Sequence, residues 1–173
     1  MTALASALVT WVFPGLMVVA ALTDLTSRRI PNWVPGAMLV GFALLAIATG
    51  MDLATLAGSL AAGLIAFAIG FALFAIGQMG GGDVKLIAAS LPWYGWGMAA
   101  LGYVVTFSIF GALLTIVFLV RRLPVVQLAL ASNAYSARLI GSPEGGREVP
   151  YGIAIAAGAI MTHASLVAAH LAG

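Results

Sequence analysis

The sequence predicts an all-α membrane protein, a polytopic bundle of about six transmembrane helices with a short fourth helix. Of the 173 residues, 63% are hydrophobic and only 7% are charged, and the mean hydropathy is +1.15. A soluble domain carries about 25% charged residues, so this chain has too little polar surface to fold as a globule in water. Residues 1–173 are predicted to form a single integral-membrane domain.

Charged residues mark the ends of the predicted helices. Three apolar stretches come first, at 3–23, 30–51 and 53–82, and another closes the chain at 149–173. Each is long enough for one membrane helix, which needs roughly 20 apolar residues to span a bilayer. Each therefore predicts one transmembrane helix, the first of them bent at Pro14.

The uncharged stretch 86–120 is too long for one membrane helix. Its 35 residues would run about 52 Å as a helix, against a hydrocarbon core of about 30 Å. It also contains Pro92, glycines and two Trp residues, which break helices or favour the membrane interface. It therefore predicts a short helix, an interfacial turn at 92–96 and a second helix ending at Val120. The polar stretch beyond it predicts an amphipathic interfacial helix over 124–140.

Six helices place every basic residue on one side of the membrane. With an outward N-terminus, the loops at 24–33, 78–85 and 121–148 share a side, and they hold all seven Lys and Arg residues. The positive-inside rule makes that side cytoplasmic. Asp52, the 92–96 turn and both termini are then predicted to face outward.

Few side chains remain for chemistry. Cysteine is absent, which excludes disulfides, thiolate catalysis and Cys-based zinc sites. The seven basic residues form no stripe of the kind that binds nucleic acid. His163 and His170 lie seven residues apart in the last predicted helix, and no carboxylate in that segment completes a metal site with them. We therefore expect a structural or interfacial role for both.

Acids at the edges of membrane helices are costly and are candidates for function. Asp24 and Asp83 both lie at helix ends on the predicted cytoplasmic side, whereas Asp52 lies on the other side and predicts a solvated helix end. Two carboxylates that are held close together share one proton near neutral pH. This arrangement suits an aspartic protease, in which the ionised acid takes a proton from water and the protonated acid polarises the scissile carbonyl.

Three glycines precede Asp83 in the segment Gly80–Lys85 (GGGDVK). They remove side chains and permit unusual backbone angles, so a substrate backbone could approach the acid closely. Simpler interpretations stay open, with Asp24 as a solvated marker of a helix end and Asp83 as the N-cap of the fourth helix. Three roles stay open for Lys85. Its side chain could reach the lipid headgroups, tune the acidity of Asp83, or contact an acidic residue of a substrate.

Three segments, in this order, resemble the motifs of the type IV prepilin peptidases, a family of GxGD intramembrane aspartic peptidases. Asp24–Asn32 (DLTSRRIPN) resembles the family's first catalytic Asp with its Ile-Pro-Asn signature. Gly80–Leu86 (GGGDVKL) resembles the Gly-x-Gly-Asp-x-Lys element that holds the second. Val149–Ala154 (VPYGIA) is similar to a Pro-x-Gly-Pro segment, with Ile153 where a second Pro is common.

The resemblance implies a membrane-embedded aspartic endopeptidase that removes the short basic leader of prepilins and pseudopilins. The cut is expected after Gly or a similar small residue, at the cytoplasmic face of a bacterial inner membrane, with both termini periplasmic. No metal or organic cofactor is implied. The expected partners are the prepilin leader region with its transmembrane helix, the lipid bilayer and the pilus assembly machinery, but no nucleic acid.

The same resemblance implies that Asp24 and Asp83 are the catalytic pair. Pro31 and Asn32 are expected to fix the loop after Asp24, with Asn32 capping the second helix or bonding to the site. The full set of supporting or substrate-binding residues is Gly80, Gly81, Gly82, Lys85, Pro31, Asn32, Pro150 and Gly152, the last two at the rim.

Longer members of the family carry an amino-terminal cytoplasmic region, often with paired Cys-x-x-Cys elements, and also N-methylate the new pilin terminus. This chain, with neither feature, resembles the short peptidase-only branch that serves tight-adherence (Flp-type) pili, with no separate methyltransferase domain. Two other interpretations stay open. One is a small proton-coupled transporter that uses the two aspartates as a relay, and the other is a non-catalytic membrane subunit of a secretion or pilus machine.

Overall fold

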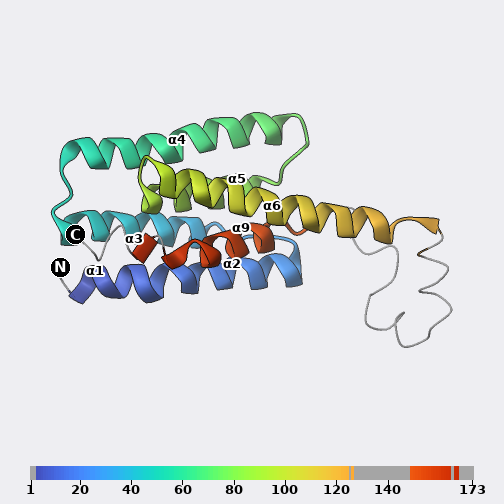
Figure 1. Ribbon diagram of the computed structural model, residues 1–173, viewed down its shortest axis with the longest axis horizontal. Helices are drawn as coiled ribbons and strands as arrows, with labels where there is room; N and C mark the ends of the chain where they lie inside the picture. Colours follow the sequence, from blue (N-terminus) through green and yellow to red (C-terminus); the bar gives the residue numbers. More distant parts are fainter. Residues whose placement is uncertain (1–2, 125, 127–148, 165, 168–173) are drawn as a thin grey trace.

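The computed structural model describes residues 3–124, 126, 149–164 and 166–167. Over these residues the chain forms a bundle of helices without a strand (Figure 1), which confirms the predicted all-α membrane fold. The elements in chain order are α1 (Ala3–Ala7), the π-helical η1 (Leu8–Val12), α2 (Phe13–Ser27), α3 (Trp33–Thr49), α4 (Leu53–Ala75), α5 (Gly81–Ser90), the 3₁₀-helical η2 (Leu91–Tyr94), α6 (Met98–Arg121) and α9 (Tyr151–Met161). The amphipathic helix predicted over 124–140 lies almost wholly outside the described residues.

Three of the described helices are long and apolar enough to cross a membrane, namely Ala3–Ser27, Leu53–Ala75 and Met98–Arg121. The first of them runs through α1, η1 and α2 without a break. Its π turn comes just before Pro14, which has no N–H to donate, and the Phe13 N–H bonds to the Leu8 carbonyl instead. The expected irregularity at Pro14 therefore takes the form of a π turn.

The helix predicted over 53–82 is wrong at its end, because α4 stops at Ala75. Gly77 adopts a φ of 74°, and the N–H groups of Gly77 and Gln78 bond back to carbonyls of the last turn of α4. A glycine in this left-handed conformation closes a helix. The chain then crosses to Gly81, where α5 begins.

The predicted short fourth helix and the turn after it are confirmed. α5 has only 10 residues, and η2 and two glycines with positive φ, Gly95 and Gly97, lead from it into α6. The aromatic residues of this turn were expected at the membrane interface, but only Trp96 is exposed. Trp93 and Tyr94 are 0% and 5% exposed, since they fill the space between helices instead of meeting lipid headgroups.

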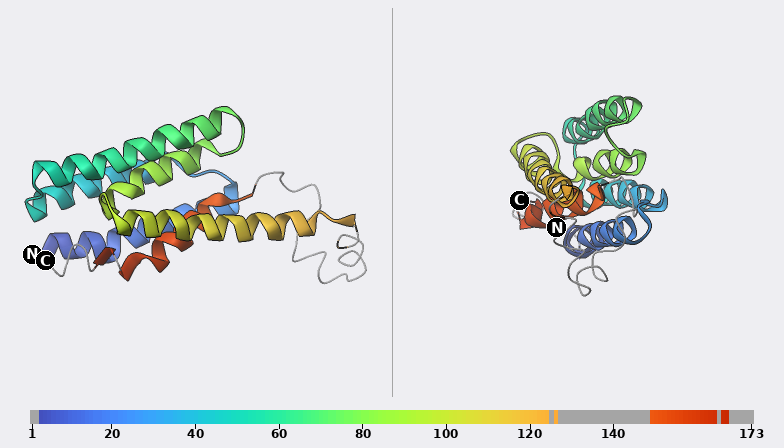
Figure 2. Two further views of the ribbon diagram at one scale, coloured as in Figure 1. Left: turned by 45° about the horizontal axis from the view of Figure 1, so that its top comes forward. Right: turned by 90° about the vertical axis from the view of Figure 1, so that its right-hand side faces the viewer.

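The core joins helices that are far apart in the sequence. α9 packs against both α2 and α6, while α5 packs against α3 and α4 (Figure 2). Between them lies an aromatic cluster. The centre of the Trp93 ring is 5.1 Å from that of the Phe13 ring, and the centre of the Tyr94 ring is 4.6 Å from that of the Tyr103 ring. The Trp93 Nε1–H also donates to the Met38 carbonyl at 3.2 Å.

Glycines allow these helices to approach one another closely. A Cβ at Gly63 would lie 2.7 Å from the Ala88 carbonyl oxygen, and one at Gly158 would lie 2.8 Å from the Phe107 Cα. Neither contact leaves room for a methyl group. Small residues therefore set the α4–α5 and α6–α9 spacings, as in other membrane bundles.

Candidate active site

Asp24 lies in the last turn of α2 and is 6% exposed. The helix ends because Arg28 adopts a left-handed conformation with φ of 53°, and the Arg28 N–H bonds to the Asp24 carbonyl at 3.0 Å. This is the one positive φ among the described residues other than glycine, and it costs about 1–2 kcal/mol for an L-residue. The chain turns directly after the acid and leads into α3.

The Asp24 carboxylate is held by the start of α9. The backbone N–H of Gly152 donates to Asp24 Oδ2 at 2.8 Å, across 128 residues of sequence. A Cβ at Gly152 would lie 2.8 Å from the same oxygen and 2.9 Å from the Asp24 Cβ. The third motif, expected only at the rim, thus supplies a direct partner of Asp24, and only glycine fits there.

Asp83 is the third residue of α5 and is 8% exposed. The N-cap position belongs to Gly80, so the alternative in which Asp83 caps the helix is wrong. A Cβ at Gly80 would lie 2.9 Å from Asp83 Oδ2, and one at Gly82 would lie 3.2 Å from the Ile30 Cβ. None of Gly80, Gly81 and Gly82 has a positive φ, so close approach, and not unusual backbone angles, accounts for these glycines.

Both aspartates line one cavity of about 690 Å³. Its walls come from the ends of α2, α4 and α5, the turn that joins α4 to α5, the loop before α3 and the start of α9. The residues that line it are Asp24, Arg28, Arg29, Ile30, Asn32, Phe74, Gly77, Gln78, Met79, Gly80, Gly81, Gly82, Asp83, Val149 and Tyr151. The arrangement brings two buried carboxylates to the wall of one cavity, which has room for many water molecules.

Sequence reasoning missed several of these lining residues. Arg28 and Arg29 lie inside the first motif, and their charges were used only for topology. Tyr151 lies inside the third motif, and its hydroxyl hydrogen-bonds to that of Thr115 at 2.8 Å, which ties α9 to α6. Gln78 and Met79 carried no signal beyond their position before the glycines.

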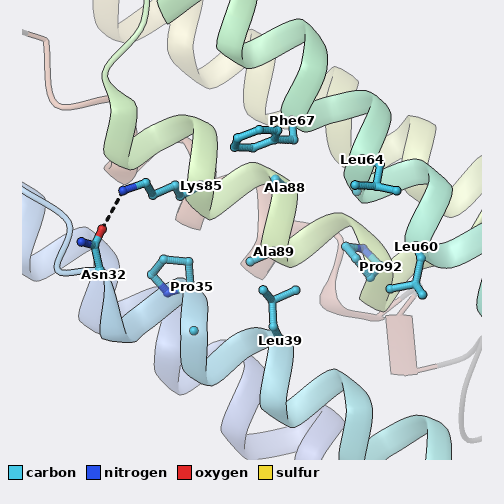
Figure 3. A pocket seen from close by; sticks show the side chains of 12 residues that line it. Asn32, Pro35, Leu39, Leu60, Leu64, Phe67, Lys85, Ala88, Ala89 and Pro92 are labelled. Atoms are coloured by element: carbon cyan, nitrogen blue, oxygen red, sulfur yellow. Dashed lines mark hydrogen bonds between the residues drawn. The ribbon is translucent and has the colours of Figure 1, made fainter.

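Lys85 and Asn32 contact each other beside the aspartate cavity (Figure 3). The Lys85 Nζ donates to the Asn32 Oδ1 at 2.9 Å. Asn32 occupies the N-cap position of α3, but its side chain makes no capping bond, so the expectation that it caps this helix is wrong. Asn32 also lines the aspartate cavity, and its role toward the two acids stays a prediction. Lys85 lines a neighbouring apolar groove and not the aspartate cavity.

Two prolines begin helices around the site. The Pro31 carbonyl accepts the Val34 N–H at 3.0 Å as the chain enters α3. Pro150 is buried at the N-cap position of α9, two residues before the glycine that bonds to Asp24. Both therefore set where a helix starts next to the cavity.

The described basic residues gather at the same end of the bundle as the two aspartates. Arg28 and Arg29 line the cavity, and the guanidinium carbons of Arg28 and Arg121 each lie 5.7 Å from the centre of the Phe118 ring. Lys85 reaches Asn32 at the cavity wall, and Arg122 follows Arg121. Arg138 and Arg147 lie outside the described residues.

Asp52 lies at the other end, exposed, and caps α4. Its carboxylate accepts from the N–H groups of Ala54 and Thr55 and from the Thr55 hydroxyl at 3.0, 3.1 and 2.6 Å. The Thr55 bonds hold the pKa of Asp52 below its ordinary value. The expected solvated helix end is thus a helix cap.

His163 hydrogen-bonds through Nε2 to the Val9 carbonyl at 3.0 Å, a contact between the segment after α9 and the π turn, while His170 lies outside the described residues. Within the part of the chain that the structure describes, no three His, Asp or Glu side chains gather where they could hold a metal ion.

Comparison with known families places this site in context. The model of the type IV leader peptidase family matches residues 11–120, well over half of the chain, and the match contains both Asp24 and Asp83. Neither the curated proteins nor the solved structures give a match. The prediction of a prepilin peptidase relative is confirmed, and the chain belongs to the type IV leader peptidase family.

Proposed function

We propose that this protein is an aspartic endopeptidase of the GxGD type that removes the short basic leader of Flp-type prepilins and pseudopilins. The observation that carries the proposal is the pair of buried carboxylates, Asp24 and Asp83, that line one cavity. Burying an acid is costly, and the fold gains no evident stability from burying two of them together. The type IV leader peptidase family supports a peptidase that acts on prepilins in general.

The reaction needs one shared proton and one water. The ionised aspartate takes a proton from water as the water oxygen bonds to the scissile carbonyl carbon, while the protonated aspartate donates to the carbonyl oxygen. The resulting gem-diol intermediate breaks its C–N bond as the leaving amine takes the proton held by the pair. One gem-diol hydroxyl returns its proton to the pair, which forms the product carboxylic acid and restores the starting protonation. Because coupled carboxylates titrate together, the proton belongs to the pair rather than to either acid.

The surrounding residues position this pair. The Gly152 N–H holds Asp24 Oδ2, and the glycines before Asp83 keep the cavity wall free of side chains. Pro31, Pro150 and the Lys85–Asn32 contact fix the adjoining helix starts. Arg28 and Arg29 in the wall repel a basic leader, so its recognition rests on features other than charge attraction inside the cavity.

The cavity faces the cytoplasm of a bacterial inner membrane in this proposal, and both termini are periplasmic. The support is the clustering of the described basic residues at the aspartate end, which the positive-inside rule associates with the cytoplasmic side. Cysteine accessibility labelling from either side of the membrane tests this, with single cysteines at Gln78 and Thr55. Labelling of the first from outside would contradict the orientation.

Cleavage of a Flp-type prepilin in membranes tests the mechanism, scored by gel shift and terminal sequencing. Asp24→Asn and Asp83→Asn are each expected to lower the rate by on the order of 10²–10⁴-fold, since each removes one half of the acid–base pair. Asp52→Asn, at equal abundance, is the matched control and should cleave normally. Undiminished cleavage in either of the first two variants would refute the aspartic mechanism. Mass spectrometry of the new pilin terminus should find a free, unmethylated amine.

A further inference from the structure

An apolar groove runs between α3 and α4 over α5, next to the aspartate cavity (Figure 3). Its walls are aliphatic and aromatic, and several wall residues are also widely exposed, with Leu39 at 49%, Leu64 at 68% and Phe67 at 43%. In a bundle that spans a membrane, such side chains meet lipid. The groove therefore opens toward the hydrocarbon of the bilayer.

One end of this groove is polar and offers hydrogen-bond donors. Lys85 and Asn32 lie there, and the Lys85 ammonium uses one of its three hydrogens on the Asn32 Oδ1. The other ammonium hydrogens and the Asn32 amide N–H groups are donors. A ligand group that matches this end accepts hydrogen bonds and carries negative charge.

The dimensions of the groove select the kind of molecule that fills it. Seven residues separate Asn32 from Leu39 and Lys85 from Pro92, so the groove is about 10 Å long at the helical rise. Its volume of about 430 Å³, spread along that length, suits a slender apolar chain that lies along α5. An extended peptide there would leave backbone groups without partners beside lipid.

We propose that this groove binds an anionic phospholipid, with one acyl chain along α5 and the phosphate at Lys85 and Asn32. Moving an acyl chain from the bilayer into the groove gains little free energy, because both surroundings are apolar. Selectivity among lipids therefore comes from the charge of the headgroup. A single Lys near an anionic headgroup favours it by about fivefold over a zwitterionic one. The site lies at the basic end of the bundle and does not depend on the proposed peptidase reaction.

Native mass spectrometry of the purified full-length protein tests the headgroup contact. The protein is titrated with phosphatidylglycerol and with phosphatidylcholine of identical acyl chains. Wild type should bind phosphatidylglycerol about fivefold more tightly than phosphatidylcholine. Lys85→Gln should remove this preference, and Lys85→Arg should keep it. Arg122→Gln removes a cation at the same end of the bundle but outside the groove, and should keep the preference.

A second pair of variants tests the groove itself. A Cβ at Gly36, in the groove wall, or at Gly102, on α6 away from it, meets no atom within 4 Å. Gly36→Leu should therefore fill the groove without a backbone clash and weaken binding of both lipids several-fold, whereas Gly102→Leu should bind as wild type.

Three results would each overturn the proposal. The first is a wild type without a headgroup preference. The second is an equal loss of preference in Lys85→Gln and Arg122→Gln, which would indicate a diffuse positive field. The third is a Gly36→Leu protein that binds both lipids as wild type does; if that variant also failed to cleave prepilin, the groove would belong to the substrate. Loss of cleavage in the aspartate variants bears only on the peptidase mechanism.

Discussion

Asp24 and Asp83, at one end of the bundle, are 6% and 8% exposed and line a shared cavity, whereas Asp52, at the other end, is exposed and bonds to the start of its own helix. The groups that donate to the Asp52 carboxylate belong to Ala54 and Thr55, within three residues of it. Asp24 instead takes a hydrogen bond from Gly152, 128 residues away. The same residue type is thus satisfied locally at one end and by tertiary packing at the other.

This difference separates stability from function. A local cap stabilises a helix at little cost, because the carboxylate stays in water. A buried pair of acids costs free energy, and proteins keep such pairs where their chemistry is needed. Substitutions at the Asp52 side and in the core are therefore expected to alter stability, and substitutions around the cavity to alter cleavage.

Trp93→Ala should have the largest effect, and on stability. Trp93 is fully buried against Phe13 and Phe42, so its removal leaves a cavity and should lower the free energy of unfolding by about 3–5 kcal/mol. Denaturant unfolding in detergent measures this. Trp96→Ala, at a residue 68% exposed, is the control and should change little. Cleavage per folded molecule should be retained in both, and its loss in Trp93→Ala would blur the separation between core and site.

Gly152→Ala should act on cleavage. The added methyl would lie 2.8 Å from Asp24 Oδ2 and 3.0 Å from its carboxyl carbon, which forces the acid or the start of α9 to move. A displacement of about 1 Å in a catalytic group costs about 10²-fold in rate. Gly102→Ala, with no neighbour within 4 Å, is the matched control. A rate for Gly152→Ala within a factor of two of wild type would show that the contact does not position the acid.

The parts of the molecule that depend on local sequence were predictable. Charge spacing and span length gave the short fourth helix and the turn after it, because both follow from the limits on helix length in a bilayer. The order of the helices also placed Asp24 and Asp83 at one end. The early stop of α4 was missed, since a left-handed Gly77 within an apolar run is not distinguishable from a helical glycine by pattern.

The parts that depend on packing were not predictable. The Gly152–Asp24 bond joins α9 to α2, and the Lys85–Asn32 bond joins residues 53 apart. Each requires the relative position of two helices, which periodicity does not specify. Trp93 was expected at the interface from its amphipathic ring, yet the space beside Gly41 buries it, where a Cβ at that glycine would lie 2.9 Å from the ring.

Gly63→Ala should have an intermediate effect, on the α4–α5 contact that supports Asp83. The new methyl would lie 2.7 Å from the Ala88 carbonyl oxygen and 2.9 Å from Pro92, and overpacking of this kind costs about 1–3 kcal/mol. Thermal unfolding in detergent measures the loss. Gly15→Ala, with open space around its Cβ, should be neutral or slightly stabilising, because alanine favours helix more than glycine. Equal melting temperatures in the two variants would contradict the close packing.

Asp52→Asn should have the smallest effect, and its pH dependence has a defined sign. Hydrogen bonds from Thr55 lower the pKa of Asp52 in the folded protein below its ordinary value of 3.8. Folding therefore favours the ionised form, so the stabilisation is present above that ordinary value and is lost as the pH falls through the lower, folded value. The difference in melting temperature between wild type and Asp52→Asn should be small and positive at about pH 6 and shrink toward about pH 3. Since the variant also cleaves normally in this account, a difference that grows on acidification, or a slower cleavage at neutral pH, would remove the distinction between the capping aspartate and the buried pair.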